Sequence, residues 1–328
     1  MKYFIGPMSK NVVDAIIDFG GIGFIPSRRQ VEYNGGYVNN WTTKEFSDYV
    51  DGRTIIQRDH GGAGQGYIDD DGRESFKNDA IFFDLIHIDP WKKYPNFIEG
   101  TEETISDMTF IYNINPKIKF EIGTEEAIRR FSVEELDLLL DKLSKLPFFD
   151  NIEYAVVQSG VGLDLGSQVN TGSYNPKRLE RMISVCKKYN VKSKEHNGDY
   201  LSKQDYKHRF DLGLDSINIA PEFGQIETLC YLKEMKDDIE DYYQICYESK
   251  RWVKWVDKGF IPENNKKELI KICGHYVFSD DKFLDIKPNI DSEIKKTIKD
   301  KLSLLVWGDM KKNVLFWIGV KSKNKLLR

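Results

Sequence analysis

The chain has 328 residues, of which 40% are hydrophobic and 30% are charged, and its formal net charge at pH 7 is -4. Its 48 basic and 52 acidic residues are interspersed rather than gathered into blocks, which excludes a nucleic-acid footprint and a polybasic membrane anchor. No apolar run reaches the roughly 18 residues needed to span a bilayer. The opening stretch Met1–Pro7 breaks too early for a signal peptide, so we expect a cytoplasmic globular protein.

Short apolar segments alternate with helical ones over the first two thirds of the chain. The apolar segments lie at residues 3–5, 22–25, 54–60, 84–89, 118–122, 155–160, 191–196 and 216–220. Amphipathic stretches such as 11–19, 131–143 and 176–188 separate them. This alternation predicts an α/β fold, a (β/α)₈ TIM barrel over residues 1–235.

The remainder, residues 236–328, is expected to be a helical extension packed on the barrel. It is rich in aromatic residues, including Trp252, Trp255, Trp307 and Trp317, and no Gly/Ser linker precedes it. The four cysteines show no CxxC spacing, which is typical of buried thiols rather than of a zinc knuckle.

Polar side chains follow the predicted strands where each strand ends. The set is Asp59 and His60; His87 and Asp89; Glu121 and Glu125; Gln158 and Ser159; Glu195, His196 and Asp199; and Asn218 and Glu222. Because the carboxyl ends of barrel strands converge on one mouth, we expect these side chains to be neighbours. Three of the five histidines of the chain belong to this set.

Imidazole and carboxylate groups together favour a zinc ion, with other divalent cations such as cobalt or manganese as alternatives. We expect His60 and His196 to be metal ligands and Glu121 to be the third. Asp59 is the expected acid/base, and Asp89 and Glu125 are further catalytic candidates. Strand alternation is expected to point His87 outward, as a packing histidine. The alternative is that these groups only satisfy the backbone at strand ends, without a metal.

Two arginines, Arg28 and Arg29, directly follow the second strand, and a guanidinium there would suit a phosphate group. The alternative is a solvated turn paired with nearby acids. The other expected substrate-binding residues are Gln158, Ser159, Asp199 and Asn218. In the extension, His275 and Tyr276 with Ser279 and Asp280 are expected to form a helix-capping turn; the alternative is that they reach the barrel mouth. No GxGxxG, Walker loop or GxSxG elbow occurs, so nucleotide-binding and hydrolase-elbow interpretations lack support.

Eight sequence blocks together resemble the GatZ/KbaZ family, the so-called non-catalytic subunit of class II tagatose-1,6-bisphosphate aldolase. They are Gln30–Val31 with Gly35–Tyr37 and Trp41–Thr42; Asp59–His60; His87–Asp89; Ile122–Glu125; Val156–Val161 with Asp164; Glu195–His196 with Asp199–Tyr200; Ala220–Pro221; and His275–Tyr276 with Ser279–Asp280. The resemblance implies a TIM barrel and a sugar-phosphate context. It implies that Asp59 acts as acid/base on an aldehyde oxygen and that His60 and His196 bind zinc.

The sequence departs from the class II aldolase pattern at two places. Gln158 stands where that pattern has a zinc histidine on strand six, as in the GatZ/KbaZ family. Asn197–Asp199 stands in place of the glycine-serine phosphate loop after strand seven. Arg28 and Arg29 also replace the smaller polar residues expected in the tagatose proteins. These differences put tagatose bisphosphate in doubt as the substrate.

The sequence supports two hypotheses from different classes. The first is a zinc-dependent aldolase-type carbon-carbon lyase, or an epimerase that forms the same enediolate, acting on a sugar or sugar phosphate in carbohydrate metabolism. The second is a non-catalytic subunit that stabilises a separate class II aldolase subunit; a homo-oligomer is a further possible assembly. Bound metal would distinguish an enzyme from an inert partner.

Overall fold

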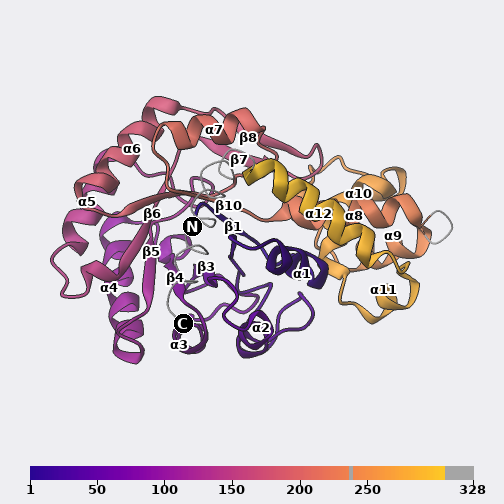
Figure 1. Ribbon diagram of the computed structural model, residues 1–328, viewed down its shortest axis with the longest axis horizontal. Coiled ribbons are helices and arrows are strands. Elements are labelled where there is room, and N and C mark those ends of the chain that lie inside the picture. The colour runs from indigo at the N-terminus through magenta and orange to yellow at the C-terminus, as the bar shows by residue number, and fades with distance from the viewer. Residues whose placement is uncertain (236–238, 307–328) are drawn as a thin grey trace, which may run out of the picture.

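Eight parallel strands form a barrel in the computed structural model, which describes residues 1–235 and 239–306 (Figure 1). The strands are β1 (Tyr3–Ile5), β2 (Gly23–Phe24), β3 (Gln57–Gly61), β4 (Leu85–Ile88), β5 (Lys119–Ile122), β6 (Ile152–Val157), β9 (Lys192–Glu195) and β10 (Ser216–Ile219). Their order is β2-β1-β10-β9-β6-β5-β4-β3. Parallel bridges pair Phe24 with Ile56 and Ser27 with Asp59, and so join the two ends of this order. The predicted TIM barrel is confirmed.

Helices follow the strands and surround the barrel (Figure 1). They are α1 (Lys10–Phe19), α2 (Thr43–Val50), α3 (Arg73–Phe82), α4 (Phe97–Ile114), α5 (Val133–Leu143), α6 (Pro176–Lys188), α7 (Lys203–Asp211) and α8 (Pro221–Glu234). In α5, a capping box between Ser132 and Glu135 fixes the first turn. Leu136, Leu140 and Leu143 then recur at helical spacing and are buried against the barrel.

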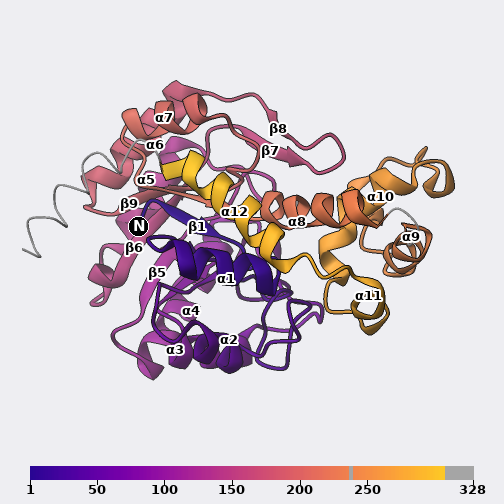
Figure 2. The ribbon, with the colours of Figure 1, turned by 45° about the vertical axis from the view of Figure 1, so that its right-hand side comes forward.

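The described part of the expected extension consists of helices that pack beside the barrel (Figure 2). They are α9 (Ile239–Glu248), α10 (Lys266–Cys273), α11 (Asp281–Ile286) and α12 (Asp291–Val306). The last of them, α12, returns to the first helix, where Lys299 Nζ lies 2.8 Å from Asp18 Oδ2. Asp280 caps α11 by accepting a hydrogen bond from Lys282 N, as expected for a capping turn. Trp307 and Trp317 lie outside the described residues.

Because side chains alternate along each strand, those that point into the barrel form layers. Phe4, Ile25, Leu85 and Tyr154 form a small apolar cluster separate from the main core. Lys194 lies directly on it, with Nζ 3.6 Å from the centre of the Phe4 ring and 4.8 Å from that of Tyr154. A polar layer therefore begins above this apolar floor, toward the carboxyl ends of the strands.

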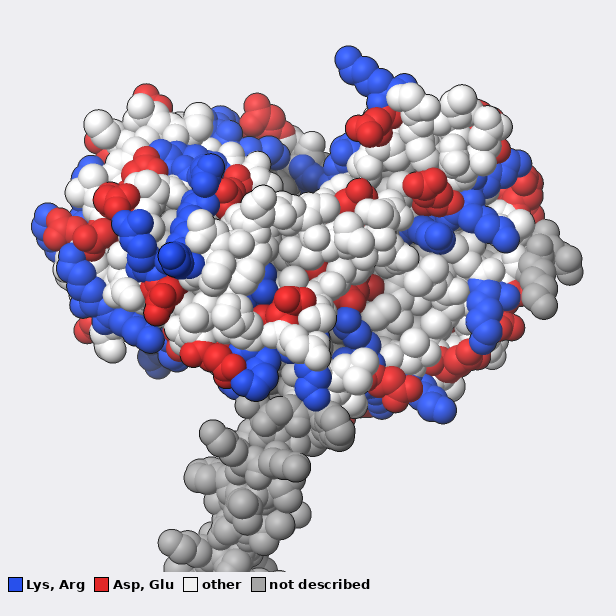
Figure 3. All heavy atoms as spheres, turned by 90° about the horizontal axis from the view of Figure 1, so that it is seen from above, with Lys and Arg blue, Asp and Glu red and all other residues white. Residues whose placement is uncertain are grey.

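A short antiparallel hairpin, β7 (Val161–Asp164) and β8 (Val169–Gly172), lies between β6 and α6. The strand pattern of the sequence does not predict it. On the face shown in Figure 3, lysine and arginine side chains are interspersed with aspartate and glutamate. Among the described helices, none combines the length and the apolar character needed to cross a membrane.

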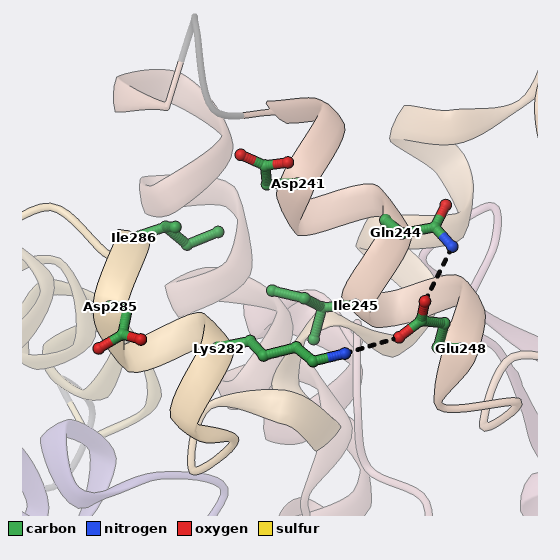
Figure 4. Close-up of a pocket in the computed structure, with 7 residues that line it drawn as sticks. All are labelled: Asp241, Gln244, Ile245, Glu248, Lys282, Asp285 and Ile286. Carbon is green, nitrogen blue, oxygen red and sulfur yellow. Dashed lines mark hydrogen bonds and ion pairs between the residues drawn. The ribbon is translucent and has the colours of Figure 1, made fainter.

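A cavity of about 280 Å³ lies between α9 and α11 (Figure 4), at the end of the molecule away from the barrel (Figure 1). Glu248 accepts hydrogen bonds from Gln244 Nε2 and Lys282 Nζ, both at 3.0 Å. Three of the polar groups that line this cavity therefore pair with one another.

Candidate functional site

Three imidazole rings and one carboxylate meet at the mouth of the barrel. His60 lies near the end of β3, His87 lies on β4 and His196 follows β9, and their ring centres are 5.0, 5.1 and 5.0 Å apart. With Asp59, each residue offers one ligand atom, and these atoms all lie within 4.8 Å of one another. The structure thus brings together Asp59, His60 and His196, as expected, and adds His87.

Adjacent residues on a regular strand point to opposite faces, yet Asp59 and His60 both reach the mouth. Arg58, just before them, points outward and pairs with Asp79 on α3 at 2.6 Å. His60 has a left-handed φ of 45°, and the register between β3 and β4 shifts between Arg58 and Gly61. This local irregularity, uncommon for a residue other than glycine, turns His60 back toward the site.

The expectation that His87 points outward is wrong. Leu85, two residues earlier on β4, belongs to the apolar cluster inside the barrel, so alternation places His87 inside as well. The run Leu85–Ile88 is buried on both faces of the strand. A continuously buried parallel strand carries no polar-apolar alternation, and the sequence therefore does not indicate which residues point inward.

An outer partner fixes one nitrogen of each imidazole. The pairs are His60 Nδ1 with Asp89 Oδ2 at 2.5 Å, His87 Nε2 with Gly123 O at 2.9 Å, and His196 Nε2 with Glu121 Oε1 at 2.6 Å. Metal-binding histidines commonly donate their second nitrogen in this way, because the partner fixes the tautomer and the ring orientation. The opposite nitrogens are the candidate ligand atoms: Nε2 of His60 and Nδ1 of His87 and His196. The Nδ1 atom of His87 also accepts a 3.3 Å hydrogen bond from His60 N.

The donors that face one another fit a divalent cation. Asp59 Oδ1 is buried without a hydrogen-bond partner, and it lies 3.8 Å from both His60 Nε2 and His196 Nδ1. Asn218 Oδ1, beside His196, is also buried without a partner. Buried oxygens left unpaired are costly, and three histidine nitrogens with an open fourth position are a typical catalytic zinc set.

Glu121, expected as the third ligand, lies behind His196 and outside this group of four. Its Oε2 atom is 2.9 Å from Lys194 Nζ and accepts a 2.7 Å hydrogen bond from Gln57 Nε2. Burial opposes its ionisation, but Lys194 and the imidazoles of His87 and His196 hold the pKa of Glu121 well below its usual value. Glu121 is therefore an anion that orients the His196 ring through its contact with Nε2. Lys194 is not among the residues predicted for the site, although alternation from His196 places it inside the barrel.

Asp89 and Glu125, the other catalytic candidates, also lie at the mouth. Asp89 is fully buried, and although burial opposes ionisation, the imidazole of His60 lowers the pKa of this carboxyl. In turn, burial lowers the pKa of His60, but Asp59 and Asp89 together raise it well above its usual value. Glu125 Oε2 accepts a 2.6 Å hydrogen bond from Asn197 Nδ2.

Several predicted substrate-binding residues make contacts within the protein. Gln158 Nε2 donates to Thr124 O at 2.7 Å, and Ser159 donates to Glu195. Asp199 Oδ1 accepts from the backbone of Ala220 and Glu222 at the start of α8, at 3.0 and 2.8 Å. Burial and the nearby Glu222 raise the pKa of Asp199 to about 8. Asn218 contacts the site directly, with Nδ2 3.1 Å from His196 Nε2.

The two arginines after β2 differ in their surroundings. Arg28 is buried, and its guanidinium pairs with Glu32 at 2.5 Å and with Asp70 at 2.7 Å. It also donates to Gly62 O at 3.0 Å, which ties the loop after β3 to the loop after β2. Arg29 makes no such pair within the described part of the chain, and its Nε atom is buried without a partner.

No protein-family model matches the chain, and no curated protein sequence matches it. Solved structures match over most of its length. One, described as a probable tagatose 6 phosphate kinase from Sinorhizobium meliloti 1021, has a TM-score of 0.65 and 15% identity, covering 93% of this chain and 87% of that one. The fructuronate-tagaturonate epimerase UxaE from Cohnella laeviribosi has a TM-score of 0.62 and 10% identity, covering 93% and 81%. The fructose-bisphosphate aldolase from Campylobacter jejuni has a TM-score of 0.54 and 12% identity, covering 93% and 89%. At these identities the likenesses establish a shared fold.

Proposed function

We propose that the chain is a metal-dependent enzyme of aldolase type that acts on a sugar or sugar phosphate, as a carbon-carbon lyase or as an epimerase that forms the same enediolate. The observation that carries the proposal is the group of Asp59, His60, His87 and His196, with ligand atoms all within 4.8 Å. Fold neighbours described as an aldolase and as a tagaturonate epimerase support this class of reaction. The resemblance to the GatZ/KbaZ family supports it as well.

The histidines His60, His87 and His196 would hold the cation, zinc first among the candidates. When bound, such a cation supplies a Lewis acid that polarises a carbonyl oxygen and acidifies the neighbouring C–H bond. Asp59 is the only carboxylate of the group, so it is the group that takes or returns a proton on a substrate in the mouth. Asp89 and Glu121 keep His60 and His196 in place through their hydrogen bonds.

Lyase and epimerase chemistry share their first requirement here. Both reactions need a base next to a polarised carbonyl, and both pass through an enediolate intermediate. They differ only in the bond that this intermediate forms afterwards. Asp59 lies within the histidine group, 3.8 Å from both His60 Nε2 and His196 Nδ1. The base and the candidate metal centre are therefore adjacent, as either reaction requires.

Metal content of the purified chain tests the proposal most directly. We expect about one divalent ion per chain by inductively coupled plasma mass spectrometry, with loss of the ion in His60→Ala and His196→Ala. His208→Ala, on the exposed side of α7, is the matched control and keeps the ion. Wild-type protein that takes up no stoichiometric metal after incubation with zinc would contradict the proposal and favour the non-catalytic subunit.

The third ligand is tested in the same series. His87→Ala should lose the ion, since His87 belongs to the group of four, whereas Glu121→Gln should retain it with reduced affinity. Exchange of solvent deuterium into candidate ketoses and ketose phosphates, followed by NMR, then reports enediolate formation for a lyase and for an epimerase alike.

A further inference from the structure

Four basic side chains gather over the barrel mouth from separate segments. Arg29 follows β2, and Lys92 ends the 3₁₀ helix Pro90–Lys92 after β4. Arg251 and Lys254 lie between α9 and α10. Within residues 1–235 and 239–306, none of the four forms an ion pair with a carboxylate. This region, called here the cationic cluster, therefore has unneutralised positive charge.

Tyrosine rings hold three members of the cationic cluster close together. The Tyr67 ring centre is 5.8 Å from Arg29 Cζ and 4.9 Å from Arg251 Cζ. The Tyr276 ring centre is 5.6 Å from Arg251 Cζ and 6.0 Å from Lys254 Nζ. Aromatic faces stabilise cations without neutralising them. The three basic groups are thus positioned side by side and remain available to an anion.

The cationic cluster lies close to the segments that carry the histidine group. Burial, with repulsion from Arg29, Arg251 and Lys92, lowers the pKa of Lys254 to about 8, although Glu125 opposes this shift. Arg29 lies two residues after Ser27, whose backbone pairs with Asp59, and Lys92 Nζ donates a 2.8 Å hydrogen bond to Gly64 O in the loop that follows His60. A molecule extending from the histidines toward the C-terminal helices would therefore meet these basic groups.

Arg28 and Arg29 are adjacent in sequence, but only Arg29 lacks acidic partners. Arg28 is fully paired, with Glu32 and Asp70, while Arg29, the next residue, leaves a buried Nε atom without an acceptor. A buried donor without an acceptor is unfavourable. An anion that presents two or more oxygens would satisfy Arg29 and lower the repulsion among its neighbours.

We propose that Arg29, Arg251 and Lys254 bind an anionic group of the substrate, a phosphate or a carboxylate, so that the segment between α9 and α10 supplies part of the active site. The proposal rests on the proposed function, since it assigns the charged end of the molecule whose carbonyl faces the histidines. It also assigns a role to the C-terminal helices, which pack beside the barrel without contributing to the metal group.

The test measures binding of inorganic phosphate, and separately of malonate, to the full-length metal-loaded protein by isothermal titration calorimetry. Arg251→Gln and Lys254→Gln should each weaken binding about tenfold, and Arg251→Lys should recover part of it. Arg181→Gln is the matched control, because Arg181 is an exposed arginine paired with Glu134 at 2.8 Å on the outer helices. A preference for phosphate over malonate would identify a sugar phosphate, and the reverse preference a sugar acid.

Metal content, measured on the same samples, separates this proposal from the proposed function. Arg251→Gln should keep its metal, while His60→Ala should lose metal and retain at least part of its phosphate binding. Equal phosphate binding by wild type, Arg251→Gln and Lys254→Gln would overturn the proposal, as would an equal loss in Arg181→Gln. Anion binding that depends on Arg251 in a protein without metal would support the anion site and contradict the metal-dependent function.

Discussion

Asp59 and His60 are consecutive residues of β3, and both side chains face the barrel mouth because His60 adopts a φ of 45°. The result is a carboxylate oxygen 3.8 Å from His60 Nε2 and equally far from His196 Nδ1 across the barrel. A regular strand would send one of the two residues into the helical layer, as it does Arg58. Backbone strain of this kind persists where the surrounding structure holds it and is frequent at functional sites.

The Asp59→Asn substitution separates proton transfer from metal binding. It preserves the size of the side chain and removes the charge, so we expect kcat, or the rate of deuterium exchange, to fall by about 10²–10⁴-fold. Bound metal, measured by mass spectrometry, should remain in the variant because the three imidazoles are unchanged. Loss of metal together with activity would instead identify Asp59 as a ligand.

The Asp89→Asn substitution tests the partner behind His60. Asp89 Oδ2 lies 2.5 Å from His60 Nδ1 and also accepts a 3.1 Å hydrogen bond from Thr124 Oγ1. Removing the charge should weaken metal affinity by about 10–100-fold, as measured by competition with a chromophoric chelator. Asp48→Asn, at an exposed position of α2, is the control. An unchanged affinity in Asp89→Asn would show that His60 is not a ligand.

Much of the barrel could be predicted from the sequence, because each strand is a short apolar run that ends in polar residues. The same pattern predicted that Asp59, His60 and His196 would meet. The position of His87 could not be predicted in the same way, since Leu85–Ile88 is buried on both faces and carries no alternation.

The cationic cluster could not be predicted from local sequence patterns, for a different reason. Arg251 and Lys254 are far in sequence from Arg29, and only the packing of the C-terminal helices brings them to a common set of tyrosine rings. The adjacent arginines Arg28 and Arg29 look equivalent in sequence. Their difference depends on Asp70, a residue whose position is set by the loop after β3.

The Arg58→Met substitution should destabilise the protein strongly. Arg58 and Asp79 are both fully buried and paired at 2.6 Å, and Arg58 also donates to Val31 O at 2.7 Å. Removing one partner leaves an uncompensated buried charge, which costs about 3–5 kcal/mol; urea unfolding measures the change. Lys188→Met breaks the exposed pair with Asp137 and should cost less than about 1 kcal/mol. Similar losses in both variants would refute this account of the Arg58–Asp79 pair.

Glu227 on α8 should make the stability depend on pH. Its Oε1 atom accepts a 2.9 Å hydrogen bond from Asn11 Nδ2 on α1, and Ser9 donates to its other oxygen. Burial raises the pKa of this carboxyl from 4.5 to about 6 in the folded protein, against these hydrogen bonds. The folded state therefore binds a proton more tightly than the unfolded chain does.

A raised carboxyl pKa stabilises the folded state below about pH 4.5, and this contribution disappears as the pH rises through about 6. The shift corresponds to roughly 2 kcal/mol. Glu227→Gln cannot titrate, so the unfolding free energy of the wild type minus that of the variant should fall by about this amount between pH 4 and pH 7. Urea unfolding across that range measures the difference, with the exposed Glu293→Gln as control. If this difference in unfolding free energy stays constant or rises with pH, Glu227 does not have a raised pKa in the folded protein. Only a group with a raised folded-state pKa makes the difference fall as the pH rises.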